Sequence, residues 1–149
     1  MKRVRIGAVT LLAAALSLVA CHHEPQPTVP TPHSDLVANA TINVPASSWR
    51  YYTIAVTSAM LSPHLEGTFT ASGGSGNDIK VLVMTEADYV NWSNGHAVYP
   101  EYSSGQVTTG SFNVSLSTGT HYLVYDNSFS SVSSKDVTTT VHLKYDTEP

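Results

Sequence analysis

The stretch Asp-Val-Thr-Thr-Thr-Val-His-Leu-Lys-Tyr-Asp, residues 136–146, decides the fold class. Its side chains alternate with a period of two. One face carries Val137, Thr139, Val141, Leu143 and Tyr145, and the other carries Asp136, Thr138, Thr140, His142 and Lys144. Such alternation is typical of a β-strand that buries one face. The sequence therefore predicts a sheet protein whose last strand covers this stretch.

Shorter runs of the same kind precede this strand and are separated by Pro, Gly, Ser and Asn clusters, which favour turns. We expect strands at 36–44, 49–57, 65–72, 78–85, 105–109, 111–116 and 120–127. The run 78–85 is apolar on both faces, which predicts a central strand. The pattern indicates an all-β fold, an antiparallel β-sandwich or jelly roll of about eight strands.

One short helix is expected over 86–93, inside the longest connection, which runs from Glu86 to Ser104. Thr85 can cap its N-terminus, with Asp88 three residues later, and acidic residues favour the positive end of the helix dipole. Gly95 suits the left-handed position after the helix end.

The N-terminal segment predicts export. Lys2, Arg3 and Arg5 precede an uncharged apolar run over 6–20, which is too short to span a bilayer but suits a secretory signal. The run ends in Leu-Val-Ala-Cys, residues 18–21, which resembles the lipobox of bacterial lipoproteins.

The lipobox resemblance implies cleavage before Cys21, with diacylglycerol on its thiol and an acyl chain on its amine. Cys21 is the only cysteine, so an intramolecular disulfide is excluded. Several acyl chains give durable attachment to a bilayer. With His22 after the cysteine, the resemblance implies the outer membrane of a Gram-negative envelope, on its periplasmic side or at the surface.

The domain organisation follows from these segments. Residues 1–20 are a signal peptide, 21–35 a lipidated cysteine and Pro-rich tether, 36–146 the β-sandwich and 147–149 a tail. Proline-rich spacers favour extended polyproline II. His22, His23 and His33 fit a polar spacer better than a metal site, because no Cys or carboxylate cluster completes a ligand set.

Charge excludes one class of partner. From Cys21 onward, four basic residues face eleven acidic ones, a net charge of −7. Such a surface repels phosphate, so nucleic-acid binding is not expected.

The second half of the domain resembles a known family. Residues 122–130 read Tyr-Leu-Val-Tyr-Asp-Asn-Ser-Phe-Ser and are followed by Lys135-Asp136-Val137. This pattern, within 76–146, is similar to the GOLD domain of secretory-pathway cargo receptors and to small bacterial β-sandwich modules of unknown function. The chain lacks the receptors' domain disulfide, coiled coil and transmembrane helix. The resemblance therefore implies an interaction module, and the receptors' trafficking activity is not carried over.

The same tail suggests a structural corner made of Asn127, Ser130 and Lys135. Asn127 ends a strand, where its amide can bond nearby loop backbone, and Lys135 can pair with a loop carbonyl or carboxylate. The alternative, a binding site at these residues, stays open. Asn77 and Asp78 offer oxygen ligands for calcium, but one carboxylate alone is too few.

No catalytic motif is present: the chain has no Gly-x-Ser-x-Gly elbow, zinc-protease motif or phosphate loop. Four dispersed histidines, His64, His96, His121 and His142, are expected at the surface. We therefore expect no enzyme, and no metal or cofactor beyond the lipid on Cys21.

Aromatic residues offer the candidate ligand or partner surface, at Trp92, Tyr99 and Tyr102. Such rings stack on sugars and anchor protein partners. The alternative is that they complete the core. The sequence thus predicts a membrane-anchored envelope lipoprotein that presents a non-catalytic β-sandwich to an envelope protein or glycan. The second hypothesis is a carbohydrate- or peptidoglycan-binding module that uses these aromatics.

Overall fold

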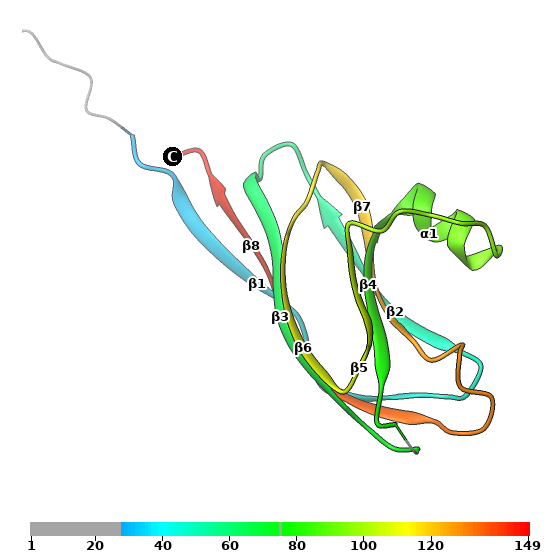
Figure 1. Ribbon diagram of the computed structural model, residues 1–149. Helices are drawn as coiled ribbons and strands as arrows, with labels where there is room; N and C mark the ends of the chain where they lie inside the picture. Colours follow the sequence, from blue (N-terminus) through cyan, green and yellow to red (C-terminus); the bar gives the residue numbers. More distant parts are fainter. Residues whose placement is uncertain (1–27, 75) are drawn as a thin grey trace, which may run out of the picture.

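The computed structural model describes residues 28–74 and 76–149; the predicted signal peptide, Cys21 and the first part of the predicted tether lie outside the described residues. The predicted antiparallel β-sandwich is confirmed: eight strands form two four-stranded sheets (Figure 1). The elements are β1 Thr31–Val44, β2 Trp49–Val56, β3 Leu61–Ser72, β4 Ile79–Thr85, α1 Glu86–Ser93, β5 Tyr102–Val107, β6 Thr109–Ser115, β7 Gly119–Asp126 and β8 Lys135–Thr147.

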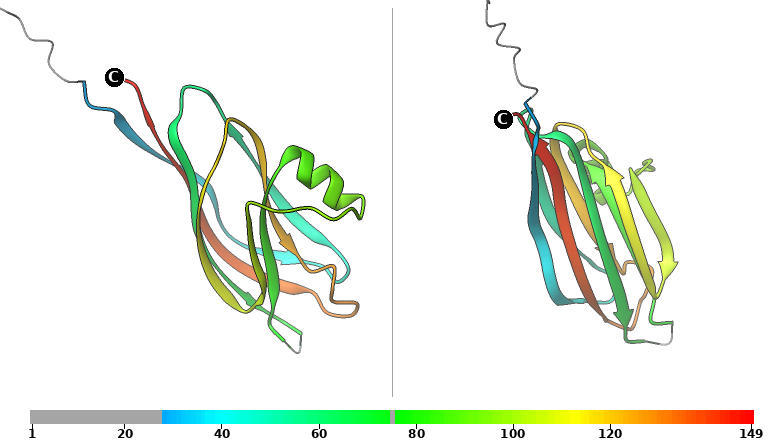
Figure 2. Two further views of the ribbon diagram at one scale, coloured as in Figure 1. Left: turned by 45° about the horizontal axis from the view of Figure 1, so that its top comes forward. Right: turned by 90° about the vertical axis from the view of Figure 1, so that its left-hand side faces the viewer.

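Each sheet places its most apolar strands inside. The first sheet has the order β1-β8-β3-β6 and the second β2-β7-β4-β5, and all pairs are antiparallel. The two sheets face each other as layers (Figure 2). β4 is an interior strand, as its two apolar faces predict, because one face meets the core and the other lies under α1.

The core between the sheets follows the predicted alternation. On β8, Val137, Thr139, Val141 and Leu143 are buried, and β7 contributes Leu123 and Tyr125 from the opposite sheet. The Tyr125 hydroxyl donates to Thr139 Oγ1 at 2.7 Å, and Thr139 Oγ1 donates to the Thr68 carbonyl at 2.9 Å. Burial raises the pKa of the Tyr125 phenol well above its usual value. This chain of hydrogen bonds links the two sheets through the core.

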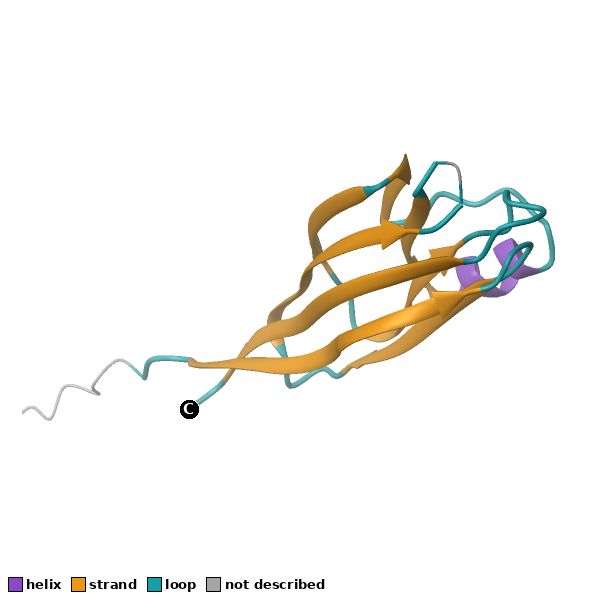
Figure 3. Cartoon of the chain, turned by 90° about the horizontal axis from the view of Figure 1, so that it is seen from below, coloured by secondary structure: helices purple, strands orange, loops and turns teal. Residues whose placement is uncertain are grey.

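The predicted tether is too long at its C-terminal end. β1 begins at Thr31, so residues 31–35 pair with β8, which itself reaches Thr147 in the predicted tail. The His33 ring stacks on Tyr145, with ring centroids 5.0 Å apart, and the Tyr145 hydroxyl donates to Asp35 at 2.9 Å. Pro32 is tolerated because an edge strand does not need every backbone N–H. Figure 3 shows the two strands running side by side toward the end that holds the C-terminus.

The predicted helix is confirmed with its cap. Thr85 Oγ1 accepts a hydrogen bond from the Asp88 N–H at 3.2 Å and donates to the Asp88 carboxylate at 3.0 Å. Gly95 follows the C-cap with φ +82°. The next strand is displaced from its predicted position: the sequence predicts it over 105–109, but β5 covers Tyr102–Val107. Gly105, with φ +66°, lies at the irregular part of the β4–β5 pairing, which lets the strand continue on its N-terminal side.

Candidate functional site

The structure separates the three aromatic residues of the predicted surface. Tyr102 lies on β5 and packs against the main core, with its ring centroid 5.4 Å from that of Phe112. Trp92 lies on α1 and packs on the outer face of the second sheet. Tyr99 is 95% exposed. Because they belong to different environments, these three rings do not form one binding face.

An outer aromatic cluster fastens α1 to the second sheet. We define it as Trp49, Tyr51, Tyr89, Trp92 and Tyr122. Tyr89 and Tyr122 stack with centroids 4.1 Å apart, and Trp49 meets Trp92 edge-on at 5.1 Å. Trp49 Nε1 donates to the Tyr89 hydroxyl at 3.3 Å. Burial, followed by the negative charge of Glu86, raises the pKa of Tyr122. Most rings of this cluster therefore pack between α1 and the second sheet, whereas Tyr51 remains half exposed.

A groove lies where β1 and β2 form the open side of the sandwich. Its volume is about 370 Å³, and it is lined by Ile42 and Asn43 of β1 and by Arg50, Tyr51 and Tyr52 of β2. We call it the open-side groove. Tyr52 packs edge-on against the core residue Tyr125 at 6.3 Å. Because successive side chains of a strand point to opposite faces, Arg50 lies on the other face of β2 from Tyr51, whose ring packs in the outer aromatic cluster.

Arg50 differs from the other basic residues of the described part of the chain, because it has no carboxylate partner there. Lys80 pairs with Asp126 at 3.5 Å and Lys135 with Asp78 at 3.1 Å, while Lys144 pairs with Glu66. Arg50 donates to the backbone carbonyl of Trp49 at 3.2 Å. Sequence reasoning missed Arg50. The signal was its place among Trp49, Tyr51 and Tyr52 in a chain with few cations.

The predicted corner residues lie together at one end of the sandwich. The Asn127 side chain is fully buried, and its amide nitrogen lies 3.2 Å from the Val44 carbonyl, 3.1 Å from that of Pro45 and 2.9 Å from that of Ser133. Ser130 Oγ donates to the Ser133 carbonyl at 3.0 Å, and the Ser130 carbonyl accepts from the Ser47 N–H at 2.7 Å. These bonds join the end of β7 to the β1–β2 turn and to the loop before β8.

Lys135 is buried and makes the pairing expected for it. Its ammonium donates to the Gly73 carbonyl at 2.9 Å and to the Asp78 carboxylate at 3.1 Å. Asn77 Oδ1 accepts from the Gly73 N–H at 2.9 Å. The oxygens considered for calcium thus already face protein donors. Within residues 28–74 and 76–149, no three His, Cys, Asp or Glu side chains gather as a metal site would require.

His121 corrects one expectation, because it lies inside the protein rather than at its surface. The residue is 1% exposed. Its Nδ1 lies 2.8 Å from the Glu101 carboxylate, and its Nε2 lies 2.8 Å from the Ser117 carbonyl. The position follows β7, which places every second side chain toward the interior. His121 therefore ties the segment before β5 to β7.

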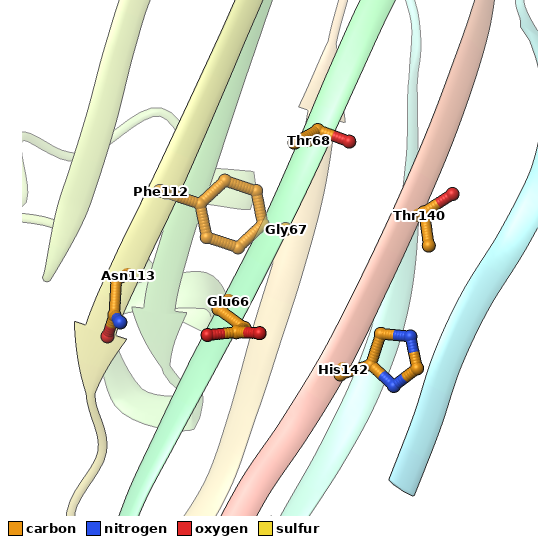
Figure 4. A pocket seen from close by; sticks show the side chains of 7 residues that line it. All are labelled: Glu66, Gly67, Thr68, Phe112, Asn113, Thr140 and His142. Atoms are coloured by element: carbon orange, nitrogen blue, oxygen red, sulfur yellow. The ribbon is translucent and has the colours of Figure 1, made fainter. Parts of the chain in front are cut away.

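A shallow hollow of about 310 Å³ lies on the outer face of the first sheet. Figure 4 shows the side chains that line it, which come from three neighbouring strands. They are Glu66, Gly67, Thr68, Phe112, Asn113, Thr140 and His142. Hydrogen bonding to Lys144 lowers the pKa of Glu66. The paired carboxylate and the uncharged Thr and Asn groups make this a polar, solvated face.

Three histidines of the described chain bond a hydroxyl or a carboxylate. Ser34 Oγ lies 3.2 Å from His142 Nδ1, and Thr147 Oγ1 lies 3.1 Å from His33 Nε2. Neither ring has a hydrogen-bonded carboxylate in the described part. His121 has one, but its other nitrogen bonds a backbone carbonyl. A hydroxyl, imidazole and carboxylate in series, as nucleophilic catalysis requires, is therefore not formed among these residues.

No family model matches the chain, and no curated protein matches its sequence. The likeness of 76–146 to the GOLD domain accordingly stays a prediction based on its motif residues. The described residues contain no helix with the length and apolar character needed to cross a bilayer.

Proposed function

We propose that the chain is a lipid-anchored envelope protein that presents a non-catalytic β-sandwich to a partner. The observation that carries the proposal is the Leu-Val-Ala-Cys sequence after an uncharged run that starts behind three basic residues. The position of the first strand is compatible with it. β1 begins at Thr31, which leaves about nine residues between Cys21 and the domain.

The anchor is tested by labelling cells with radioactive palmitate. We expect the wild-type chain to incorporate label and to sediment with membranes, and Cys21→Ser to do neither. No second thiol can take over the modification in this variant, because Cys21 is the only cysteine. Label that persists in Cys21→Ser, or a wild-type chain without label, contradicts the anchor.

The interaction role is supported by the predicted corner residues, whose polar groups are used to hold the fold together. The buried polar side chains of Asn127 and Lys135 bond backbone carbonyls of the loops around them. Cross-linking in intact membranes, followed by purification of the chain, should recover a reproducible partner protein or glycan. Repeated recovery of the chain alone contradicts this role.

Carbohydrate binding is the second candidate function. It is favoured by the half-exposed Tyr51 ring at the open-side groove, because exposed aromatic faces stack on sugar rings. If the sugar bound instead at the surface predicted from sequence, Trp92→Ala and Tyr102→Ala would abolish glycan binding. Glycan binding that survives both substitutions contradicts a site at those residues.

A further inference from the structure

β1 is an outer strand of the first sheet, as the right-hand view of Figure 2 shows. Backbone groups of such a strand point alternately toward its neighbour and toward the open edge. Two backbone bonds set this alternation across the sheet: the Ala71 N–H donates to the Thr108 carbonyl at 2.7 Å, and the Leu116 N–H to the Pro63 carbonyl at 2.9 Å. Odd-numbered residues of β3 therefore bond β6, and even-numbered ones bond β8.

The strand register then fixes which backbone groups of β1 face the open edge. Because even-numbered residues of β8 bond β3, its odd-numbered residues bond β1, where their partners are Ala38, Ala40 and Ile42. The N–H and C=O groups of the residues between and after these consequently point outward, at Asn39, Thr41 and Asn43. In residues 28–74 and 76–149, the hydrogen bonds that these three residues make outside the strand ladder come from their side chains.

The other three sheet edges of the described chain have side chains on their backbone groups. On β2, Arg50 donates to the Trp49 carbonyl at 3.2 Å. On β6, the Tyr102 hydroxyl donates to the Ser111 carbonyl at 3.4 Å. β5 is irregular at Gly105, whose carbonyl accepts from the hydroxyl of the preceding serine at 2.7 Å. Irregularity and covering of this kind hinder the addition of another strand.

β1 is protected in the same way only in its first half. Pro32 and the charge of Asp35 lie there, followed by the irregular pairing between Leu36 and Ala38. Residues 38–44 read Ala-Asn-Ala-Thr-Ile-Asn-Val and pair regularly with β8, with no charge and no proline. We call residues 38–44 the uncovered edge. Uncharged segments with β propensity at an open edge are prone to pair with another strand.

We propose that the uncovered edge pairs with the uncovered edge of a second copy of this chain, antiparallel, about a two-fold axis at Thr41. The first sheets of the two copies then join into one continuous sheet. In this register Thr41 lies opposite its own counterpart, and Asn39 of each copy lies opposite Asn43 of the other. All of these residues have outward backbone groups, so each pair exchanges two backbone hydrogen bonds. The proposal names a partner for the proposed interaction module and does not depend on the lipid of Cys21.

The side chains of the uncovered edge complement each other in the same register. Asn39 Oδ1 accepts from the Thr140 hydroxyl at 3.3 Å, which leaves the Asn39 amide N–H groups as donors. Asn43 Nδ2 donates to Asp136 at 2.8 Å, which leaves the Asn43 side-chain oxygen as an acceptor. A free donor of each copy thus faces a free acceptor of the other. An isologous interface requires such self-complementarity, which is why the occupant is a second copy rather than an unrelated strand.

The opposite face of the uncovered edge also favours this pairing. There the exposed Ala40 lies across from Ile42 of the other copy, a half-buried residue that packs against the core. A small side chain opposite a large one lets the two backbones approach, and the pair removes apolar surface from water.

The dimer is compatible with anchoring of both copies in one bilayer. Antiparallel pairing directs the two N-termini away from each other, so the strands lie along the membrane. About nine residues separate Cys21 from Thr31, and they can reach up to roughly 30 Å. That distance exceeds the ~10 Å between two packed sheets.

The oligomeric state of the full-length chain tests the proposal. Sedimentation equilibrium is run in a density-matched detergent at physiological salt, which screens the repulsion between two acidic chains. We expect a monomer–dimer equilibrium between micromolar and millimolar concentration. Thr41→Lys places two like charges opposite each other at the axis and should weaken the dimer at least tenfold. Thr53→Lys, at an exposed threonine on the edge strand β2, is the matched control and should dimerise as the wild type does.

A second variant tests the side-chain contact without adding charge. Asn39→Ala removes the free donor of both copies and should weaken the dimer about tenfold. Because Asn39 is exposed, the Tm of the monomer should stay close to that of the wild type, which separates weaker pairing from misfolding.

Disulfide trapping tests the register. The Cα atoms of a hydrogen-bonded pair lie about 5.5 Å apart, a distance that a disulfide can span. Thr41→Cys should therefore oxidise to a cross-linked dimer at least tenfold faster than Thr53→Cys. Mass spectrometry of the disulfide-linked peptides identifies the thiols that have reacted, so a free thiol at Cys21 is not mistaken for the cross-link.

Three results overturn the inference: the wild-type chain stays monomeric at millimolar concentration, Thr41→Lys dimerises as the wild type does, or Thr41→Cys cross-links no faster than Thr53→Cys. The acyl state of Cys21, read by mass spectrometry on the same sample, is independent of all three. Failure of the pairing is thereby distinguished from failure of the anchor.

Discussion

Replacing Asn127 with Ala removes the side chain that ties the two sheets together at the corner. The Asn127 amide nitrogen faces carbonyls of Val44, Pro45 and Ser133, which belong to the end of β1, the turn after it and the loop before β8. The residue itself follows β7 in the other sheet. The substitution therefore acts where three segments distant in sequence meet.

The expected loss of stability follows from these contacts. An amide has two N–H groups, so about two net hydrogen bonds of about 1 kcal/mol each are lost. Carbonyls that stay buried without a donor add about 1 kcal/mol or more. The unfolding free energy should fall by about 3 kcal/mol, and Tm by roughly 10 °C for a domain of this size.

Urea denaturation and calorimetry of the full-length chain measure this loss. Asn113→Ala is the matched control, because Asn113 is an exposed residue of β6; its Tm should change by less than about 2 °C. Asn127→Asp separates loss of the donor from loss of volume. It places a buried negative oxygen against carbonyls and should destabilise more than Ala. A Tm for Asn127→Ala within about 2 °C of the wild type refutes this role of the side chain.

Further predictions concern the other buried and paired groups. Lys135→Met should lower the unfolding free energy by about 2 kcal/mol in urea, because it leaves a partly exposed carboxylate unpaired; equal stability contradicts the pairing. Tyr125→Phe should cost about 1 kcal/mol by the same assay, since Thr139 keeps its bond to a backbone carbonyl; no loss would show that the hydroxyl is not bonded. The pKa of Glu66 is lowered from its ordinary value of 4.5, so its stabilisation is present above that pH and lost as pH falls below it. Thermal melts across this acid range should show less pH dependence in Lys144→Gln than in the wild type, and an identical dependence contradicts the pair.

The strands could be predicted from sequence because their burial follows a local period. Val137, Val141 and Leu143 face the core as the alternation requires, and the capping pair of Thr85 and Asp88 marks the helix start. The ends of the strands could not be predicted from this local period. Thr31 belongs to β1 because β8 is long enough to pair with it, and that length is a property of two segments far apart in sequence.

The candidate site was harder to predict, because it depends on which strands of the two sheets lie next to each other in the fold. Tyr102 and Trp92 are near in sequence but pack on opposite faces of one sheet. Ile42 and Arg50 line one groove only because β1 and β2 stand at the edges of different sheets. The burial of His121 could not be predicted either, because its partners, the Glu101 carboxylate and the Ser117 carbonyl, lie in the connections that flank β5 and β7.

The anchor is tested most directly by the mass of the N-terminal proteolytic peptide of the chain extracted from membranes. We predict a peptide that begins at Cys21 and carries a diacylglycerol thioether with an acylated amine. A peptide that begins at Met1, with an unmodified Cys21 thiol, contradicts the anchor and the proposed function with it.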